Sequence, residues 1–255
     1  MKQASAQEPV PAPAPAKEET LKLLPPMPQW YEPNYWMPPD IWSGSFEVGI
    51  NGSEGNAESF SMRVGGSLKR KTDWDQFDWK TTVAKTESKG VVTQNNALMN
   101  AREEIFLGDS RWSIFQNTML EYDEFKAFDL RLVLNAGLGY LYYKSDTTKL
   151  KGRLGAGTSR EFGGPSTEWV PEGDFGIDFE HQISKKQKLT ATVDYYPDWG
   201  DFTDYRLVTN VGWEMLIDEA SNLNLKIGVI DRYDSTPHGL KPNDFDYSIL
   251  LLWKL

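Results

Sequence analysis

An alternation of apolar and polar residues with a period of two constrains this chain more than any other feature. The string Asp-x-Arg-Leu-Val-x-Asn-x-Gly occurs twice, at residues 129–137 and 204–212. In the first copy the even positions are leucine or alanine, whereas the odd positions begin with Asp129 and Arg131. Because successive side chains of a strand point to opposite faces, each copy predicts a β-strand with one apolar face and one polar face that carries an Asp–Arg pair.

The same alternation recurs from residue 42 onward and predicts about twelve strands. They cover residues 42–51, 57–69, 73–86, 91–106, 111–123, 129–143, 148–161, 173–184, 188–197, 204–217, 222–233 and 244–254. Most are about twice as long as the roughly five or six residues typical of soluble sheets. The connections after the even-numbered strands are short, and several of the others are longer, which is typical of up-and-down membrane barrels with tight periplasmic turns.

Two fold classes fit long, two-faced strands: a soluble sandwich and a membrane barrel. A sandwich needs a second sheet to bury its apolar face. In a barrel surrounded by lipid the charged face points into the lumen, whereas an arginine on the lipid face would cost about 2–4 kcal/mol at the bilayer midplane. No apolar run approaches the roughly 18 residues of a transmembrane helix. We therefore predict an all-β, up-and-down antiparallel transmembrane β-barrel over residues 41–255.

The start of the chain differs in composition from the rest. Ten of the 15 prolines fall within residues 1–40. Proline fixes φ and lacks a backbone N–H, so this segment favours neither helix nor central strand. We predict a largely disordered, Pro-rich periplasmic tether over residues 1–40.

Charged residues of both signs fall on the face that we expect to line the lumen. We call this set the lumen charge ladder, and its members are Arg63, Asp129, Arg131, Arg153, Asp178, Glu180, Asp194, Asp204, Arg206, Glu214 and Lys226. Such a set can link the strands by ion pairs across a filled interior, or it can line a narrow, hydrated pore.

A second group of carboxylates lies where three predicted hairpins meet the outer rim. Its members are Asp123, Asp198, Asp201, Asp231, Asp234 and Asp244. Oxygen ligands from several loops suit Ca²⁺ or Mg²⁺, so a rim cation site is one interpretation. The favoured alternative is that these residues cap turns and pair with Arg131, Arg206 and Arg232.

Composition excludes several other functions. The net charge of -10 argues against a nucleic-acid partner, and the absence of cysteine excludes disulfides and thiolate metal sites. His181 and His238 are the only histidines, and neither has a serine two residues away on the same strand face. We therefore predict no catalytic residues, no enzyme activity and no resident cofactor.

Several separate blocks of the sequence resemble one bacterial family. They are residues 42–56, 121–140, 178–184, 194–207 and 230–244. Together they are similar to the family of salt-induced outer-membrane proteins, catalogued as domain of unknown function 481. The resemblance implies an outer-membrane β-barrel of unassigned biochemical role, with no catalytic residues to carry over.

The end of the chain supports that location. An apolar residue occupies every second position at Tyr247, Ile249, Leu251, Trp253 and Leu255. This resembles the C-terminal signature that the barrel assembly machinery recognises, although the usual final aromatic residue is a leucine here. We expect a monomer in the bacterial outer membrane that contacts lipid and lipopolysaccharide, either as a structural protein of the envelope stress response or as a narrow pore for ions and small solutes. The alternatives are a barrel enzyme acting on lipid or envelope substrates, and a binding module that uses the acidic, aromatic rim.

Overall fold

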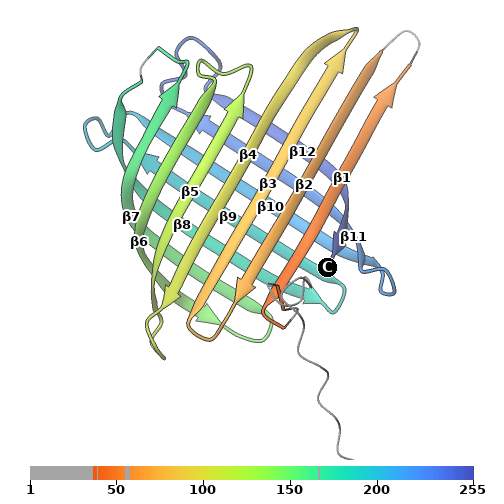
Figure 1. Ribbon diagram of the computed structural model, residues 1–255, viewed down its shortest axis with the longest axis vertical. Helices are drawn as coiled ribbons and strands as arrows, with labels where there is room; N and C mark the ends of the chain where they lie inside the picture. The colour runs from red at the N-terminus through yellow and green to blue at the C-terminus, as the bar shows by residue number, and fades with distance from the viewer. Residues whose placement is uncertain (1–36, 39, 55–57, 166) are drawn as a thin grey trace, which may run out of the picture. The chain divides into compact units, whose positions relative to one another are not determined.

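A computed structural model describes residues 37–38, 40–54, 58–165 and 167–255. Twelve antiparallel strands form one closed barrel (Figure 1). They are β1 Trp42–Ser53, β2 Ser59–Lys71, β3 Asp75–Ser88, β4 Val91–Phe106, β5 Trp112–Asp123, β6 Leu130–Lys144, β7 Thr148–Phe162, β8 Trp169–Ser184, β9 Gln187–Pro197, β10 Tyr205–Asp218, β11 Leu223–Asp234 and β12 Asn243–Lys254. The predicted all-β, up-and-down fold is confirmed. The predicted tether falls almost entirely outside the described residues.

Each strand pairs with its neighbours in sequence, and β1 pairs with β12 to close the barrel. Tight turns join the even-numbered strands to the next strand at one end of the barrel. At the other end the connections vary in length. The β3–β4 turn consists of Lys89 and Gly90, whose φ values of 52 and 75 are the positive values that a two-residue type I′ turn requires.

The pairing of β1 with β12, which we call the seam, is short. Its register runs from Ser45↔Lys254 to Val48↔Leu251. On the other side of β1 the register with β2 runs over the whole strand, from Trp42↔Arg70 to Ser53↔Ser59. The part of β1 beyond Val48 is therefore paired in register with β2 alone.

The two faces of the wall follow the alternation in the sequence. Large apolar side chains point outward and are exposed, among them Leu134, Leu138, Leu154, Ile177 and Ile249. The side chains that point inward are mostly polar: within the described residues, 17 polar or charged residues are buried against seven hydrophobic ones. This distribution is the reverse of a water-soluble protein, whose interior is apolar. No helix of the described residues is long and apolar enough to cross a membrane.

One strand begins earlier than the sequence pattern predicts. Strand β8 starts at Trp169 rather than at residue 173 and includes Pro171. Although Pro171 has no N–H to donate, it stands near the start of its strand, where proline is tolerated. Its carbonyl oxygen accepts a hydrogen bond from the backbone N–H of Trp199, at 3.0 Å. This extension brings Glu172 onto the inner wall.

Candidate functional site

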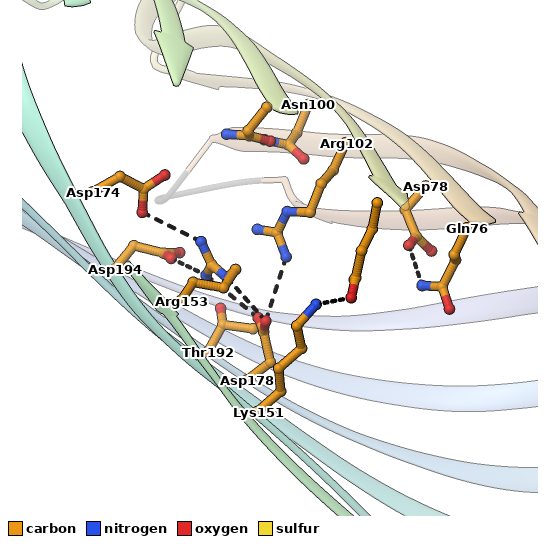
Figure 2. A network of polar contacts seen from close by, with 12 residues as sticks. Gln76, Asp78, Asn100, Arg102, Lys151, Arg153, Asp174, Asp178, Thr192 and Asp194 are labelled. Atoms are coloured by element: carbon orange, nitrogen blue, oxygen red, sulfur yellow. Dashed lines mark hydrogen bonds and ion pairs between the residues drawn. The ribbon is translucent and has the colours of Figure 1, made fainter. Parts of the chain in front are cut away.

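Arg153 on β7 is the centre of the ion-pair network inside the barrel (Figure 2). Its side chain is completely buried. Its Nη1 lies 3.4 Å from Asp174 Oδ1, and its Nε donates to Asp178 Oδ2 at 3.0 Å. A third ion pair joins its Nη2 to Asp194 on β9. One guanidinium thus holds carboxylates from two strands.

A glycine in the wall makes this arrangement fit. Gly176 lies opposite Arg153 on one side and Asp194 on the other. A Cβ atom at Gly176 would lie only 2.3 Å from Arg153 Nη2. Because β8 carries no side chain at this point, the guanidinium can lie across it and reach β9.

Other ion pairs join strands that are not neighbours. Arg102 Nη1 on β4 lies 3.4 Å from Asp178 Oδ2 on β8, although three strands separate them around the wall. In Figure 2 the guanidinium of Arg102 approaches Asp178 from a different direction than that of Arg153. Glu104, also on β4, pairs with Lys151 on β7. These contacts span the interior of the barrel.

A second cluster lies toward the end of the barrel that carries the longer loops. Arg131 on β6 contacts Glu161 at 2.5 Å, Asp234 at 3.3 Å and Glu121 at 3.6 Å. Asp234 belongs to β11, and four strands separate it from β6. The Arg131 guanidinium also lies 4.2 Å from the ring centroid of Phe128, within cation–π range. The interior is thus bridged near this end as well.

The remaining members of the lumen charge ladder form pairs along the wall. Arg206 pairs with Glu172, Lys226 with Glu47, Arg63 with Asp246 at 3.8 Å, Glu180 with Lys188 at 2.9 Å, and Glu214 with Lys254 at 2.8 Å. Each of these five ladder residues thus pairs with an opposite charge from another strand.

Asp129 and Asp204 are exceptions, because within the described residues neither forms an ion pair with the arginine of its own repeated string. Each aspartate precedes the first residue of its strand. Asp129 is exposed and forms no ion pair within the described residues, while Asp204 accepts a hydrogen bond from the Thr236 hydroxyl at 2.6 Å. The repeated arginines, Arg131 and Arg206, pair with carboxylates of other strands instead.

Sequence reasoning missed many of the partners. The ladder did not include Glu47, Arg102, Glu104, Glu121, Glu161, Glu172, Asp174 and Asp246. Glu161, Glu172 and Asp174 lie on the same strand face as ladder members of β7 and β8, whereas Glu47, Arg102, Glu104, Glu121 and Asp246 lie on strands that hold no ladder member. Glu172 was hidden by its position beside Pro171, which made that stretch resemble a loop.

The six rim carboxylates do not converge on one point. Asp198 and Asp201 accept hydrogen bonds from backbone N–H groups two residues later, and the bonds from Thr203 hold the pKa of Asp201 below its usual value. Asp123 accepts from the backbone N–H of Phe125, and Asp244 pairs with Lys126. Asp234 pairs with Arg131 as described above.

Asp231 faces away from the other rim carboxylates. Its neighbour Arg232 points inward to Asp246, with Nη2 2.6 Å from the carboxylate, so Asp231 is on the outward face of β11. Within the part of the chain that the structure describes, no group of three or more histidine, aspartate or glutamate residues could hold a metal ion. A rim cation site therefore has no set of ligands among these residues.

A cavity of ≈ 240 Å³ lies beside the Arg131 cluster. The pattern of residues did not predict this cavity, because its walls come from several strands and loops. Its lining includes Arg131, Arg160, Arg206, Ser159, Glu161, Glu168, Glu172, Tyr196, Asp198, Asp204, Asp234, Thr236 and His238.

Comparisons with known proteins identify a family for most of the chain. A family model described as "Protein of unknown function, DUF481" matches residues 46–255. No curated protein matches the chain.

Among solved structures, the chain is similar to the KdgM porin in complex with disordered oligogalacturonate, at 12% identity and a TM-score of 0.43, over 84% of this chain and 98% of that chain. For the NanC porin the identity is 8% and the TM-score 0.44, over 83% and 97% of the two chains. For the translocator domain of the autotransporter NalP from Neisseria meningitidis the values are 13% and 0.41, over 84% and 86%.

Proposed function

The chain belongs to the DUF481 family of proteins of unknown function, and we propose that it is a bacterial outer-membrane barrel that passes small ions slowly through a narrow, ion-paired lumen. Two properties support this proposal: the apolar outer surface and the ion pairs that cross the interior.

The outer surface supports a position in a bilayer. Hydrocarbon cannot hydrogen-bond to backbone groups, so only helices and closed barrels span it. Here the outward residues are large and apolar, as at Leu154, which is 57% exposed, while its neighbour Arg153 is buried inside. In this orientation lipid and lipopolysaccharide contact the outward face, and the apolar residues of β12 serve as the signal for the barrel assembly machinery.

The lumen supports slow passage of small ions. The main observation in favour of slow ion passage is the contact between Arg102 and Asp178, because it joins two distant parts of the wall. The side chains of both residues are partly exposed, at 20% and 26%, so water reaches this bridge. Charges of both signs line the path, which gives hydrated ions of either sign only modest stabilisation.

Single-channel recording in planar bilayers tests the proposal. We expect a small conductance for the natural chain and a larger one for Arg102→Ala, because this change removes a bridge across the lumen. Lys188→Ala is the matched control, since its partner Glu180 lies on the adjacent strand and both side chains are more exposed than those of Arg102 and Asp178. If neither the natural chain nor Arg102→Ala conducts, the barrel is closed and its role is structural.

A further inference from the structure

We infer that the cavity beside the Arg131 cluster binds a small organic cation that carries ammonium groups. This inference deepens the proposed function by naming a class of solute that the lumen holds. Its volume of ≈ 240 Å³ is far above the roughly 10–15 Å³ that a single water needs, and it leaves room for a short aliphatic diamine.

Glu172 provides the main observation. It lines the cavity and is 2% exposed, and its Oε2 pairs with Arg206. Its Oε1 is buried and has no hydrogen-bond partner. Buried carboxylate oxygens are normally satisfied, and the group they accept most strongly from is a charged N–H donor. An ammonium group in the cavity would supply that donor.

The charge of the lining determines the sign of the ligand. Six carboxylates and three guanidinium groups line the cavity. The guanidinium groups of Arg131 and Arg206 are already paired with Glu161, Asp234 and Glu172.

Asp198 and Asp204 have only neutral donors. Asp198 accepts from the backbone N–H of Gly200, and Asp204 accepts from the hydroxyl of Thr236. Their negative charges therefore remain uncompensated by any ion pair within the described residues. An anion would be repelled from this lining, whereas a cation would be attracted.

The test compares three four-carbon solutes of similar length: putrescine, which carries two ammonium groups, the neutral 1,4-butanediol, and the dianion succinate. Isothermal titration calorimetry with the full chain refolded in detergent measures each. We expect putrescine to bind, butanediol to bind at least about tenfold more weakly, and succinate not to bind. Equal binding of putrescine and butanediol, preferential binding of succinate, or no heat with putrescine would each overturn the inference.

Variants locate the site. Glu172→Gln should weaken putrescine binding by about tenfold or more, because the amide keeps the shape but removes the charge. Asp204→Asn should weaken it as well without changing the Arg206–Glu172 pair, so a folding defect of the first variant leaves the test intact. Asp201→Asn is the control, since Asp201 does not line the cavity and is exposed. A loss of binding in this control equal to that in the other two would place the ligand elsewhere.

The test of the cavity site can fail independently of the test of the proposed channel. Calorimetry requires a folded barrel but no conduction. Conductance without putrescine binding would refute the cavity site and leave the channel. Putrescine binding without conductance would leave the site and refute the channel.

Discussion

Replacing Arg153 by methionine tests whether the interior network stabilises the barrel. The change keeps an unbranched, flexible side chain but removes a completely buried guanidinium. Within the described residues, Asp174 and Asp194 would lose their only ion pairs, while Asp178 would keep Arg102. Removing one partner of a buried ion pair costs about 3–5 kcal/mol, because the remaining charge is left uncompensated. The unfolding equilibrium should therefore shift by roughly 10²- to 10⁴-fold toward the unfolded state.

Denaturant titration of the detergent-refolded protein measures this change, with the fluorescence of the ten tryptophans as the signal. Lys188→Met is the control: it breaks a pair whose side chains are 31% and 50% exposed, so it should cost less than about 1 kcal/mol. Adding Asp174→Asn and Asp194→Asn to Arg153→Met should recover part of the loss. The reasoning is refuted if Arg153→Met costs no more than Lys188→Met, or if neutralising the two aspartates increases the loss.

Three further predictions concern the wall. Leu154→Arg, on the outward face, should lower the free energy of unfolding in lipid by about 2–4 kcal/mol, as measured by denaturant titration in vesicles. Gly137→Ala should cost about 1–3 kcal/mol in the same assay, since its Cβ would lie 2.3 Å from the Leu154 carbonyl oxygen; an unchanged midpoint would contradict this close approach. A cysteine pair at Phe46 and Trp253, which are opposite each other across the seam, should raise stability by up to about 5 kcal/mol when oxidised, and reductant should abolish the gain.

The alternation of residues predicted the strands, their number and the face on which most of the ladder residues lie. This succeeded because a period of two determines the face directly, and because an apolar exterior and a charged interior make the two faces chemically distinct. Leu154 and Arg153 are adjacent in sequence and lie on opposite sides of the wall. The same rule places Arg102 inside, although the ladder did not include it.

The partners of these residues could not be predicted in the same way. Alternation fixes a face, but it does not fix how high a residue stands in the barrel or which strand lies across from it. Arg102 and Asp178 meet because of the tilt of the strands and the stagger of twelve registers, to which every hairpin contributes. The repeated strings show most clearly that alternation does not predict ion-pair partners, since Asp129 and Arg131 are two residues apart and yet do not pair.

The short seam affects how the barrel closes. Two ion pairs reach across it from within: Lys226 on β11 to Glu47 on β1, and Arg63 on β2 to Asp246 on β12. Each ion pair joins two strands that are separated by one other strand. Each therefore reinforces the barrel where few backbone hydrogen bonds join β1 to β12. The pairing of β1 with β12 that closes the barrel should thus be sensitive to ionic strength. Under mechanical load the wall should part there before it parts anywhere else.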